Sequence, residues 1–169
     1  MMKTLLIMRH AKSSWKDAEL PDLERPLNKR GKHDAPMMGE LIKDKELRPQ
    51  VMYASTAKRA QMTAEEVASA CKFKGDITYL ENLYLAEAEA ILNVLRSTPD
   101  EIERVLIIGH NPGLEGLLQI LSRRVESLPT AAIAYLALPI SHWADLNDQV
   151  EGELVELWKP REIKHKSKK

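Results

Sequence analysis

Two histidines stand at the carboxyl ends of strand-like apolar runs at distant points of the chain. Arg9 and His10 follow the run 4–8, and His110 follows the run 104–108. The carboxyl ends of the strands of an open parallel sheet border the crevice in which ligands bind, so both histidines would reach one site. There an unprotonated imidazole can attack phosphorus while a guanidinium holds the phosphate oxygens. The pattern therefore predicts phosphoryl-transfer chemistry through a histidine.

A third junction between a strand and a helix carries the same kinds of side chain. Ser55 and Arg59 follow the apolar run 51–54 and open a helical pattern, as His110 and Asn111 do after the later strand. The starts of helices add backbone N–H donors and the positive end of the helix dipole. Each histidine alone is also compatible with a structural role. The three junctions together supply the groups that a dianionic phosphate requires.

Hydrophobic spacing predicts alternating strands and helices around these junctions. Short apolar runs without helical spacing predict strands at 4–9, 51–54, 77–80 and 104–108, with weaker candidates at 131–138 and 153–158. Apolar residues three and four apart predict helices at 29–45, 60–71, 85–95 and 114–121. Asn28 is a suitable N-cap for the first helix, in which Pro36 and Gly39 predict a kink or a later start. The alternation predicts a single α/β domain of three α/β/α layers with a mostly parallel central sheet.

The composition is that of an ordinary globular protein. The chain has 169 residues, 30% of them charged and 44% hydrophobic, and its 25 basic side chains balance 25 acidic ones. A chain of this size can bury a substantial core. The charge balance gives no steering towards nucleic acid or membrane surfaces. We expect one domain over residues 1–160, and we expect the basic residues 161–169 to form a disordered tail.

The sequence shows no membrane, secretion or nucleic-acid-binding pattern. No apolar stretch approaches the ~18–20 residues of a membrane span, and the N-terminal run is too short for a signal sequence. The single Cys71 fits a reducing compartment, so we expect a cytoplasmic protein. We also expect the protein to be a monomer or a weak dimer. The three tryptophans form no stacking array, so we expect no nucleic-acid partner. His10 and His110 could ligate a metal, but the nearby arginines would repel a dication, so we expect neither a metal nor a cofactor.

The three junctions resemble the three motifs of the histidine phosphatase superfamily. Residues 6–12 (LIMRHAK) resemble its RHG signature, with Ala11 where glycine is usual. Residues 55–64 resemble its second motif, and residues 108–111 (IGHN) resemble its third. The alanine should cost little as long as its φ is negative. Residues 24–31, together with the lack of a large insertion, resemble the small SixA-type phosphohistidine phosphatases.

This resemblance implies a phosphoglycerate mutase-like fold and a role for each motif residue. His10 would be the nucleophile and would form a phosphohistidine intermediate. Arg9 and Arg59 would bind the phosphoryl oxygens, and a protonated His110 would donate to the same oxygens. Glu81 is the candidate general acid, because many relatives carry an acidic residue at this place.

The sequence leaves the roles of several residues open. Glu81 is equally compatible with a solvated loop carboxylate, and Glu87 and Glu89 are rival acids on a helix. Arg25 could reach the edge of the phosphate, or it could pair with Glu24 or Asp22. The candidate substrate contacts are Lys12, Trp15, Arg25, Ser55 and Asn111. If the polar loop 11–28 closes over the substrate, Trp15 and Arg25 would approach the site.

The resemblance implies a metal-independent phosphatase that removes phosphate from phosphohistidine in a protein partner. The short chain leaves little material for a cap over the site, which suits a phosphate on a protein surface. Three alternatives remain: a small-molecule phosphomonoesterase with the same mechanism, a phosphoglycerate-type mutase, and a phosphate-binding module without turnover. Trp15 and Lys16 stand where many sugar-phosphate-specific members have an asparagine, which argues against a sugar phosphate.

Overall fold

A single six-stranded sheet forms the centre of the molecule in a computed structural model that describes residues 2–167. The strands lie in the order β3-β2-β4-β1-β5-β6. The parallel part consists of β3 (Thr78–Leu80), β2 (Val51–Ser55), β4 (Arg104–Gly109) and β1 (Lys3–Arg9). β5 (Ile133–Leu138) and β6 (Glu153–Trp158) continue the sheet in the antiparallel sense. The predicted α/β class with a mostly parallel sheet is therefore confirmed.

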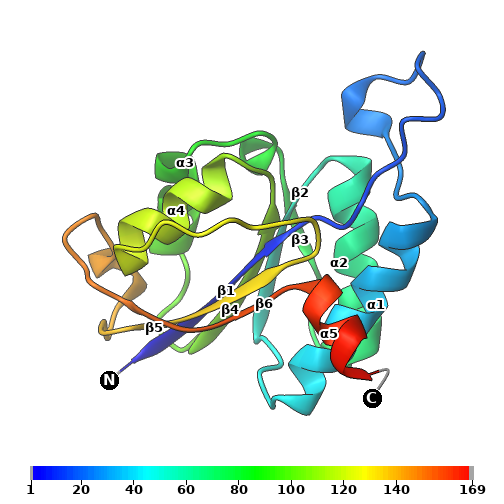
Figure 1. The fold of residues 1–169 in the computed structure, drawn as a ribbon. Helices are drawn as coiled ribbons and strands as arrows, with labels where there is room; N and C mark the ends of the chain where they lie inside the picture. The colour runs from blue at the N-terminus through cyan, green and yellow to red at the C-terminus, as the bar shows by residue number, and fades with distance from the viewer. Residues whose placement is uncertain (1, 168–169) are drawn as a thin grey trace.

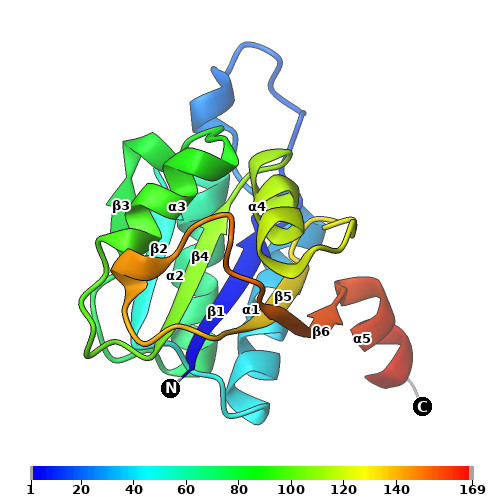
Figure 2. The ribbon, with the colours of Figure 1, turned by 90° about the vertical axis from the view of Figure 1, so that its left-hand side faces the viewer.

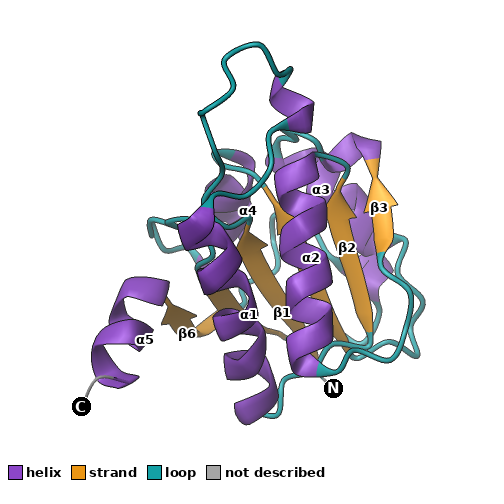
Figure 3. Ribbon diagram, turned by 90° about the vertical axis from the view of Figure 1, so that its right-hand side faces the viewer, coloured by secondary structure: helices purple, strands orange, loops and turns teal. Residues whose placement is uncertain are grey.

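Two pairs of helices cover the two faces of this sheet (Figure 1). α1 (Lys29–Asp44) and α2 (Lys58–Cys71) lie in front of the sheet in Figure 3. α3 (Ala88–Arg96) and α4 (Gly113–Ser122) lie on the opposite face, which is nearest the viewer in Figure 2. The result is the expected three-layer α/β/α arrangement.

The alternation of side chains along β1 explains how one apolar run serves both layers. Leu5 and Ile7 belong to the core beneath α3 and α4, whereas Leu6 and Met8 belong to the core beneath α1 and α2. All four side chains are fully buried. A strand covered on both faces needs apolar residues at every position, and this requirement produces the continuous run seen in the sequence.

The predicted strands and helices are all present, with differences at their ends. Asn28 caps α1 as expected, because its side chain accepts a hydrogen bond from the N–H of Gly31. The later start that we considered for this helix is wrong, since α1 begins at Lys29 and includes Pro36. The third helix begins at Ala88 rather than at residue 85, and Leu85 lies exposed with a positive φ.

The C-terminal segment differs from the disordered tail expected over 161–169. α5 (Pro160–Ser167) continues from β6, and residues 168–169 lie outside the described residues. Proline at the first helical position has a φ suited to a helix start. Ile163 then packs against the core on the α1 side of the sheet, so this short helix is anchored by apolar contact.

The loop 11–28 projects beyond the carboxyl ends of the parallel strands, at the top of Figures 2 and 3. It contains one short 3-10 helix, Asp22–Glu24, and its two arms are joined by a β-bridge between Ser13 and Leu27. The loop therefore stands beside the edge of the sheet at which the predicted site lies. In the part of the chain that the structure describes, no helix has the length and apolar character needed to cross a membrane.

Candidate active site

His10 and His110 meet because they follow neighbouring parallel strands. β1 and β4 pair with Arg9 opposite Gly109, so the next residue of each strand emerges at the same edge. The N–H of His10 donates to the carbonyl of Gly109 at 3.1 Å. The centroids of the two imidazole rings lie 5.1 Å apart. The prediction that both histidines reach one site is confirmed.

A pocket of about 210 Å³ surrounds this pair. Its walls are formed by Arg9, His10, Lys12, Ser13, Trp15, Arg25, Arg59, Leu85, His110, Asn111 and Thr130. Eight of the ten residues that the sequence singled out are therefore in this wall. The two exceptions are Ser55 and Glu81.

His10 has the protonation state of a nucleophile. Its Nδ1 lies 2.7 Å from the carbonyl oxygen of Ala11. A carbonyl can only accept, so Nδ1 carries the hydrogen and Nε2 keeps its lone pair. Burial, reinforced by the charges of His110, Arg59 and Arg9, lowers the pKa of His10 to about 3. The ring is therefore neutral at physiological pH, and Nε2 is available to attack.

Ser55 forms a hydrogen bond with the imidazole ring of His110. The Ser55 hydroxyl lies 2.8 Å from Nε2 of His110 and accepts a hydrogen bond from the N–H of Ala57 at 3.2 Å. The hydroxyl oxygen has a second lone pair, so this contact allows either the hydroxyl to donate to Nε2 or Nε2–H to donate to the hydroxyl. Nδ1 of His110 is buried and has no hydrogen-bond partner. Ser55 is fully buried and lies outside the pocket wall, so the structure does not make it the substrate contact that we expected.

The charge of His110 also differs from the expectation. Burial, followed by the charge of Arg59, lowers the pKa of His110 to about 4. The free protein therefore carries a neutral His110 rather than the protonated ring implied by the resemblance. A neutral imidazole can still donate through its N–H to a phosphoryl oxygen.

Two of the arginines in the pocket wall, Arg9 and Arg59, belong to β1 and α2. Arg9 ends β1 and donates through Nη1 to the carbonyl of Leu128 at 3.2 Å, while its Nε is buried without a partner. Arg59 lies in the first turn of α2 and is 4% exposed. Asn111, which follows His110, donates through Nδ2 to the carbonyl of Leu128 at 2.9 Å. Leu128 thus anchors two of the expected phosphate-site residues.

Arg25 and Trp15 bring the loop 11–28 to the pocket. The guanidinium carbon of Arg25 lies 3.3 Å from the centroid of the Trp15 ring, a cation–π stack. Arg25 donates through Nε to the carbonyl of Ser14 at 3.1 Å and through Nη1 to Asp22 at 2.8 Å. Its Nη2 contacts the hydroxyl of Ser13. Of the two alternatives for Arg25, the structure shows the pairing with Asp22, and it also places Arg25 in the wall of the pocket.

The chain after His10 is fixed by close backbone contacts. Ala11, which has no positive φ, donates its N–H to the Thr63 hydroxyl at 3.0 Å. Lys12 accepts a hydrogen bond from the N–H of Asn28 at 3.0 Å. A Cβ at Gly31 would lie 2.1 Å from the carbonyl oxygen of Lys12. The glycine therefore allows α1 to approach this part of the site.

The structure does not bring Glu81 to the pocket. Glu81 is exposed and begins a 3-10 helix, Glu81–Leu83, directly after β3. β3 is the edge strand, and β2 and β4 separate it from β1. The carboxyl end of β3 is consequently the farthest of the four parallel strand ends from His10. The order of strands in the sheet, which spacing along the chain does not reveal, explains why Glu81 is outside the pocket wall.

Two residues that the sequence analysis did not select lie beside the histidines. The Tyr84 ring meets the His110 ring edge to face, with 5.5 Å between centroids. The Tyr84 hydroxyl donates to Asp22, whose carboxylate also receives Arg59 and Arg25. Asp22 had been named only as one possible partner of Arg25, and no periodic pattern marks Tyr84. The rule that functional residues gather at the carboxyl ends of parallel strands could have drawn attention to Tyr84, four residues beyond β3.

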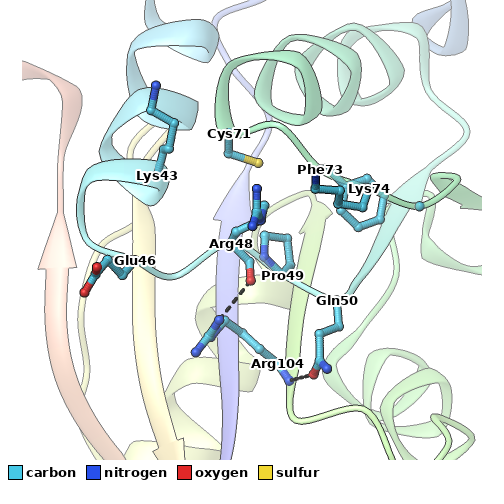
Figure 4. A pocket seen from close by; sticks show the side chains of 10 residues that line it. Lys43, Glu46, Arg48, Pro49, Gln50, Cys71, Phe73, Lys74 and Arg104 are labelled. Atoms are coloured by element: carbon cyan, nitrogen blue, oxygen red, sulfur yellow. Dashed lines mark hydrogen bonds between the residues drawn. The ribbon is translucent and has the colours of Figure 1, made fainter.

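A larger hollow, of about 650 Å³, lies at the other end of the sheet (Figure 4). Residues just before β2 and at the start of β4 form part of its wall. Arg48 donates to the carbonyl of Lys72 at the end of α2, and Arg104 donates to the carbonyl of Arg48. These arginines satisfy backbone carbonyls, and none of the three motifs reaches this hollow. Among the described residues, no three His, Cys, Asp or Glu side chains form a group that could hold a metal ion.

Comparison with known proteins agrees with this geometry. The model of the histidine phosphatase superfamily (branch 1) matches residues 5–88. An uncharacterised chloroplast protein of Arabidopsis thaliana is 29% identical over 153 residues, which are 85% of this chain and 70% of that protein. A structure assigned as the phosphohistidine phosphatase SixA of Agrobacterium tumefaciens has a TM-score of 0.81 at 25% identity, covering 94% of this chain and 98% of its own. A structure of the protein histidine phosphatase SixA with tungstate has a TM-score of 0.80 at 22% identity, covering 95% and 99%.

The fold and the paired histidines define an α/β phosphatase site, in which a histidine and several guanidinium groups share one pocket. Over residues 5–88 the chain matches the histidine phosphatase superfamily (branch 1), and over nearly its whole length it is similar to the SixA structure of Agrobacterium tumefaciens.

Proposed function

We propose that the protein hydrolyses phosphohistidine on a protein partner through a phosphorylated His10, without a metal ion. The observation that carries this proposal is the hydrogen bond from Nδ1 of His10 to the Ala11 carbonyl. It leaves Nε2 unprotonated inside a pocket lined by three arginines. A neutral imidazole beside cationic donors is the arrangement that nucleophilic attack on a phosphoryl group requires.

The reaction has two displacements. In the first, the lone pair on Nε2 of His10 forms a bond to phosphorus while the bond between phosphorus and the substrate nitrogen breaks. The leaving nitrogen takes up a proton from solvent and departs as neutral imidazole. In the second, the oxygen of a water molecule forms a bond to phosphorus and releases one proton to solvent, while the bond between phosphorus and Nε2 breaks. Phosphate leaves, and the electron pair returns to Nε2. Arg9, Arg59 and the N–H of His110 stabilise the charge on the equatorial oxygens in both steps.

The composition of the pocket wall favours a phosphoramidate substrate. Among the described residues, no carboxyl group lines the pocket. The protonated nitrogen of a phosphoramidate leaves with less help from a general acid than an alkoxide does. A site with cationic donors but no carboxylic acid therefore suits phosphohistidine better than an alkyl phosphate. The similarity to SixA, named a protein histidine phosphatase, supports the same substrate.

The mouth of the pocket favours a phosphate presented on a protein. Trp15 is 72% exposed and Leu85 is 55% exposed, and both lie in the pocket wall. Exposed apolar side chains around a polar site are typical of surfaces that contact another protein. We also propose that the protein acts in the cytoplasm, where a reducing environment keeps Cys71 as a free thiol.

The test compares phosphate release from a phosphohistidine-bearing phosphotransfer protein and from p-nitrophenyl phosphate, with a metal chelator present. The variants are His10→Ala and, as the matched control, His33→Ala, which removes an exposed histidine of α1. We expect faster release from the phosphoprotein, lost in His10→Ala and kept in His33→Ala. Release from the small ester alone would indicate that the natural substrate is a small phosphoester. Activity that survives His10→Ala would show that His10 is not the nucleophile.

A further inference from the structure

We propose that Asp22 is a positioning residue, which holds Arg59 and Arg25 in the orientation that receives the phosphoryl group. The inference rests on the proposed function, because it assigns a role to a residue beside the phosphate site. Asp22 belongs to the loop 11–28 and lies outside the three motifs.

The contact between Asp22 and Arg59 involves two different acceptors. Nη1 of Arg59 donates to the main-chain carbonyl of Asp22 at 2.7 Å, and Nη2 donates to its Oδ2 at 2.9 Å. Two contacts from one residue define both the position and the plane of the guanidinium. A guanidinium has five N–H donors, and these contacts use two of them, so donors remain for the pocket that Arg59 lines.

The other carboxylate oxygen of Asp22 holds the second arginine. Nη1 of Arg25 donates to Oδ1 at 2.8 Å, and the Tyr84 hydroxyl donates to Oδ2. The hydrogen bond from Tyr84, followed by those from Arg59 and Arg25, holds the pKa of the Asp22 carboxyl well below its usual range. Asp22 is thus a permanent carboxylate, and it cannot be the proton donor of the reaction. Its partners come from α2, from the loop 11–28 and from the segment after β3.

This network orients donors before the substrate arrives. Tyr84, which donates to Asp22, also packs its ring edge to face on His110. One carboxylate therefore links two guanidinium groups with the second histidine of the site. Donors that are already oriented lose less conformational freedom in the transition state, and a misplacement of about 1 Å can cost ~10²-fold in rate.

A competing role for Asp22 predicts a different result. The carboxylate could act as an internal anion that occupies Arg59 until phosphate displaces it. The main-chain carbonyl contact argues for positioning, because a backbone carbonyl bound to Nη1 does not imitate a phosphate oxygen. If Asp22 positions Arg59, loss of the carboxylate slows turnover. If Asp22 competes with phosphate for Arg59, loss of the carboxylate strengthens phosphate binding.

The experiment compares Asp22→Asn with Glu24→Gln, which neutralises an exposed carboxylate two residues further along the same loop. We expect Asp22→Asn to lower kcat by ~10–100-fold on the phosphohistidine protein and on p-nitrophenyl phosphate, with KM changed less than about threefold. Glu24→Gln should leave kcat and KM unchanged. An unchanged kcat in Asp22→Asn, or a lower KM with faster turnover, would overturn the proposal.

Calorimetric binding of vanadate and inorganic phosphate separates this inference from the proposed function. Vanadate accepts the five-coordinate geometry of a transition state, whereas phosphate reports ground-state binding. Asp22→Asn should weaken vanadate binding by about tenfold or more and phosphate binding by less than about threefold. If the wild type hydrolyses neither substrate, the proposed function fails, and the vanadate result alone decides the role of Asp22. Equal vanadate affinity in wild type and variant would overturn that role.

Two further variants test whether Asp22 acts through Arg59 and replace Asp22→Asn if it does not fold. Arg59→Lys removes the planar guanidinium. If Asp22 acts in part through Arg59, adding Asp22→Asn to Arg59→Lys should slow turnover by a smaller factor than Asp22→Asn does in the wild type. Full additivity of the two losses would contradict the proposal. If Asp22→Asn does not fold, Asp22→Glu replaces it, because one extra methylene displaces both carboxylate oxygens and should still lower kcat and vanadate affinity.

Discussion

The imidazole rings of His10 and His110 lie 5.1 Å apart with 54° between their planes, although they belong to segments that are distant in sequence. Pairing of β1 with β4 sets this distance, because Arg9 stands opposite Gly109. Burial lowers the pKa of both rings, to about 3 for His10 and about 4 for His110. Two neutral rings can occupy this space without mutual repulsion, which leaves His10 free to act as a nucleophile.

The first prediction concerns the dependence of stability on pH. The unfolded chain has ordinary histidines, with a pKa near 6.5. Between pH 6.5 and the folded values, the unfolded chain binds more protons than the folded one, so acid favours unfolding. The contribution of His10 and His110 is fully present above pH 6.5 and is lost as the pH falls towards 4. Each can add a slope of up to ~1.4 kcal/mol per pH unit in this window.

Urea unfolding followed by tryptophan fluorescence at pH 7, 6, 5 and 4.5 measures this slope. The double variant His10→Gln, His110→Gln should show a clearly shallower decline than the wild type, because it lacks both groups. Equal slopes in the two proteins would mean that neither histidine is held neutral by the fold.

The second prediction concerns Ser55, whose hydroxyl forms a hydrogen bond with Nε2 of His110 and so orients the ring. Ser55→Ala should lower kcat by ~10-fold, by analogy with the hydrogen-bond partners of metal-ligating histidines, whose loss costs ~10–100-fold. Ser122→Ala is the matched control, since this buried hydroxyl donates to the Leu118 carbonyl within α4. Both substitutions should cost ~1 kcal/mol of stability. Steady-state kinetics should separate them, and equal kcat in the two variants would remove Ser55 from the site.

The core of the site could be predicted from sequence because it follows from strand ends. Apolar runs mark β1, β2 and β4, and the parallel arrangement places the next residues of each run together. No comparable rule applies to the loop 11–28, whose polar residues carry no period. The contact of Asp22 with Arg59 and Tyr84 depends on how this loop folds back over α2, and only the structure reveals it.

The third prediction uses two glycines inside helices. A Cβ at Gly31 of α1 would lie 2.1 Å from the Lys12 carbonyl oxygen, whereas a Cβ at Gly116 of α4 would find its nearest neighbour, Ala88, at 3.8 Å. Gly116→Ala should therefore stabilise the protein by ~0.5–1 kcal/mol, as expected for alanine in a helix. Gly31→Ala should destabilise it and should also lower kcat, because the displaced backbone of Lys12 is joined through Ala11 to His10. Thermal unfolding and kinetics of both variants test this; a stabilised, fully active Gly31→Ala would contradict the close approach.

The last prediction concerns the proton donor. Because Glu81 is exposed beside the edge strand β3, Glu81→Gln should keep kcat within about twofold of the wild type. Phenyl phosphate is the discriminating substrate, since its phenolate is a poorer leaving group than p-nitrophenolate and gains more from a general acid. His10→Ala serves as the inactive reference in the same assay. If Glu81→Gln lost tenfold or more on phenyl phosphate while keeping its rate on p-nitrophenyl phosphate, the carboxyl of Glu81 would have to reach the leaving oxygen during turnover. The segment after β3 would then move towards His10 when substrate binds, and Tyr84, which lies in that segment against His110, would have to move with it.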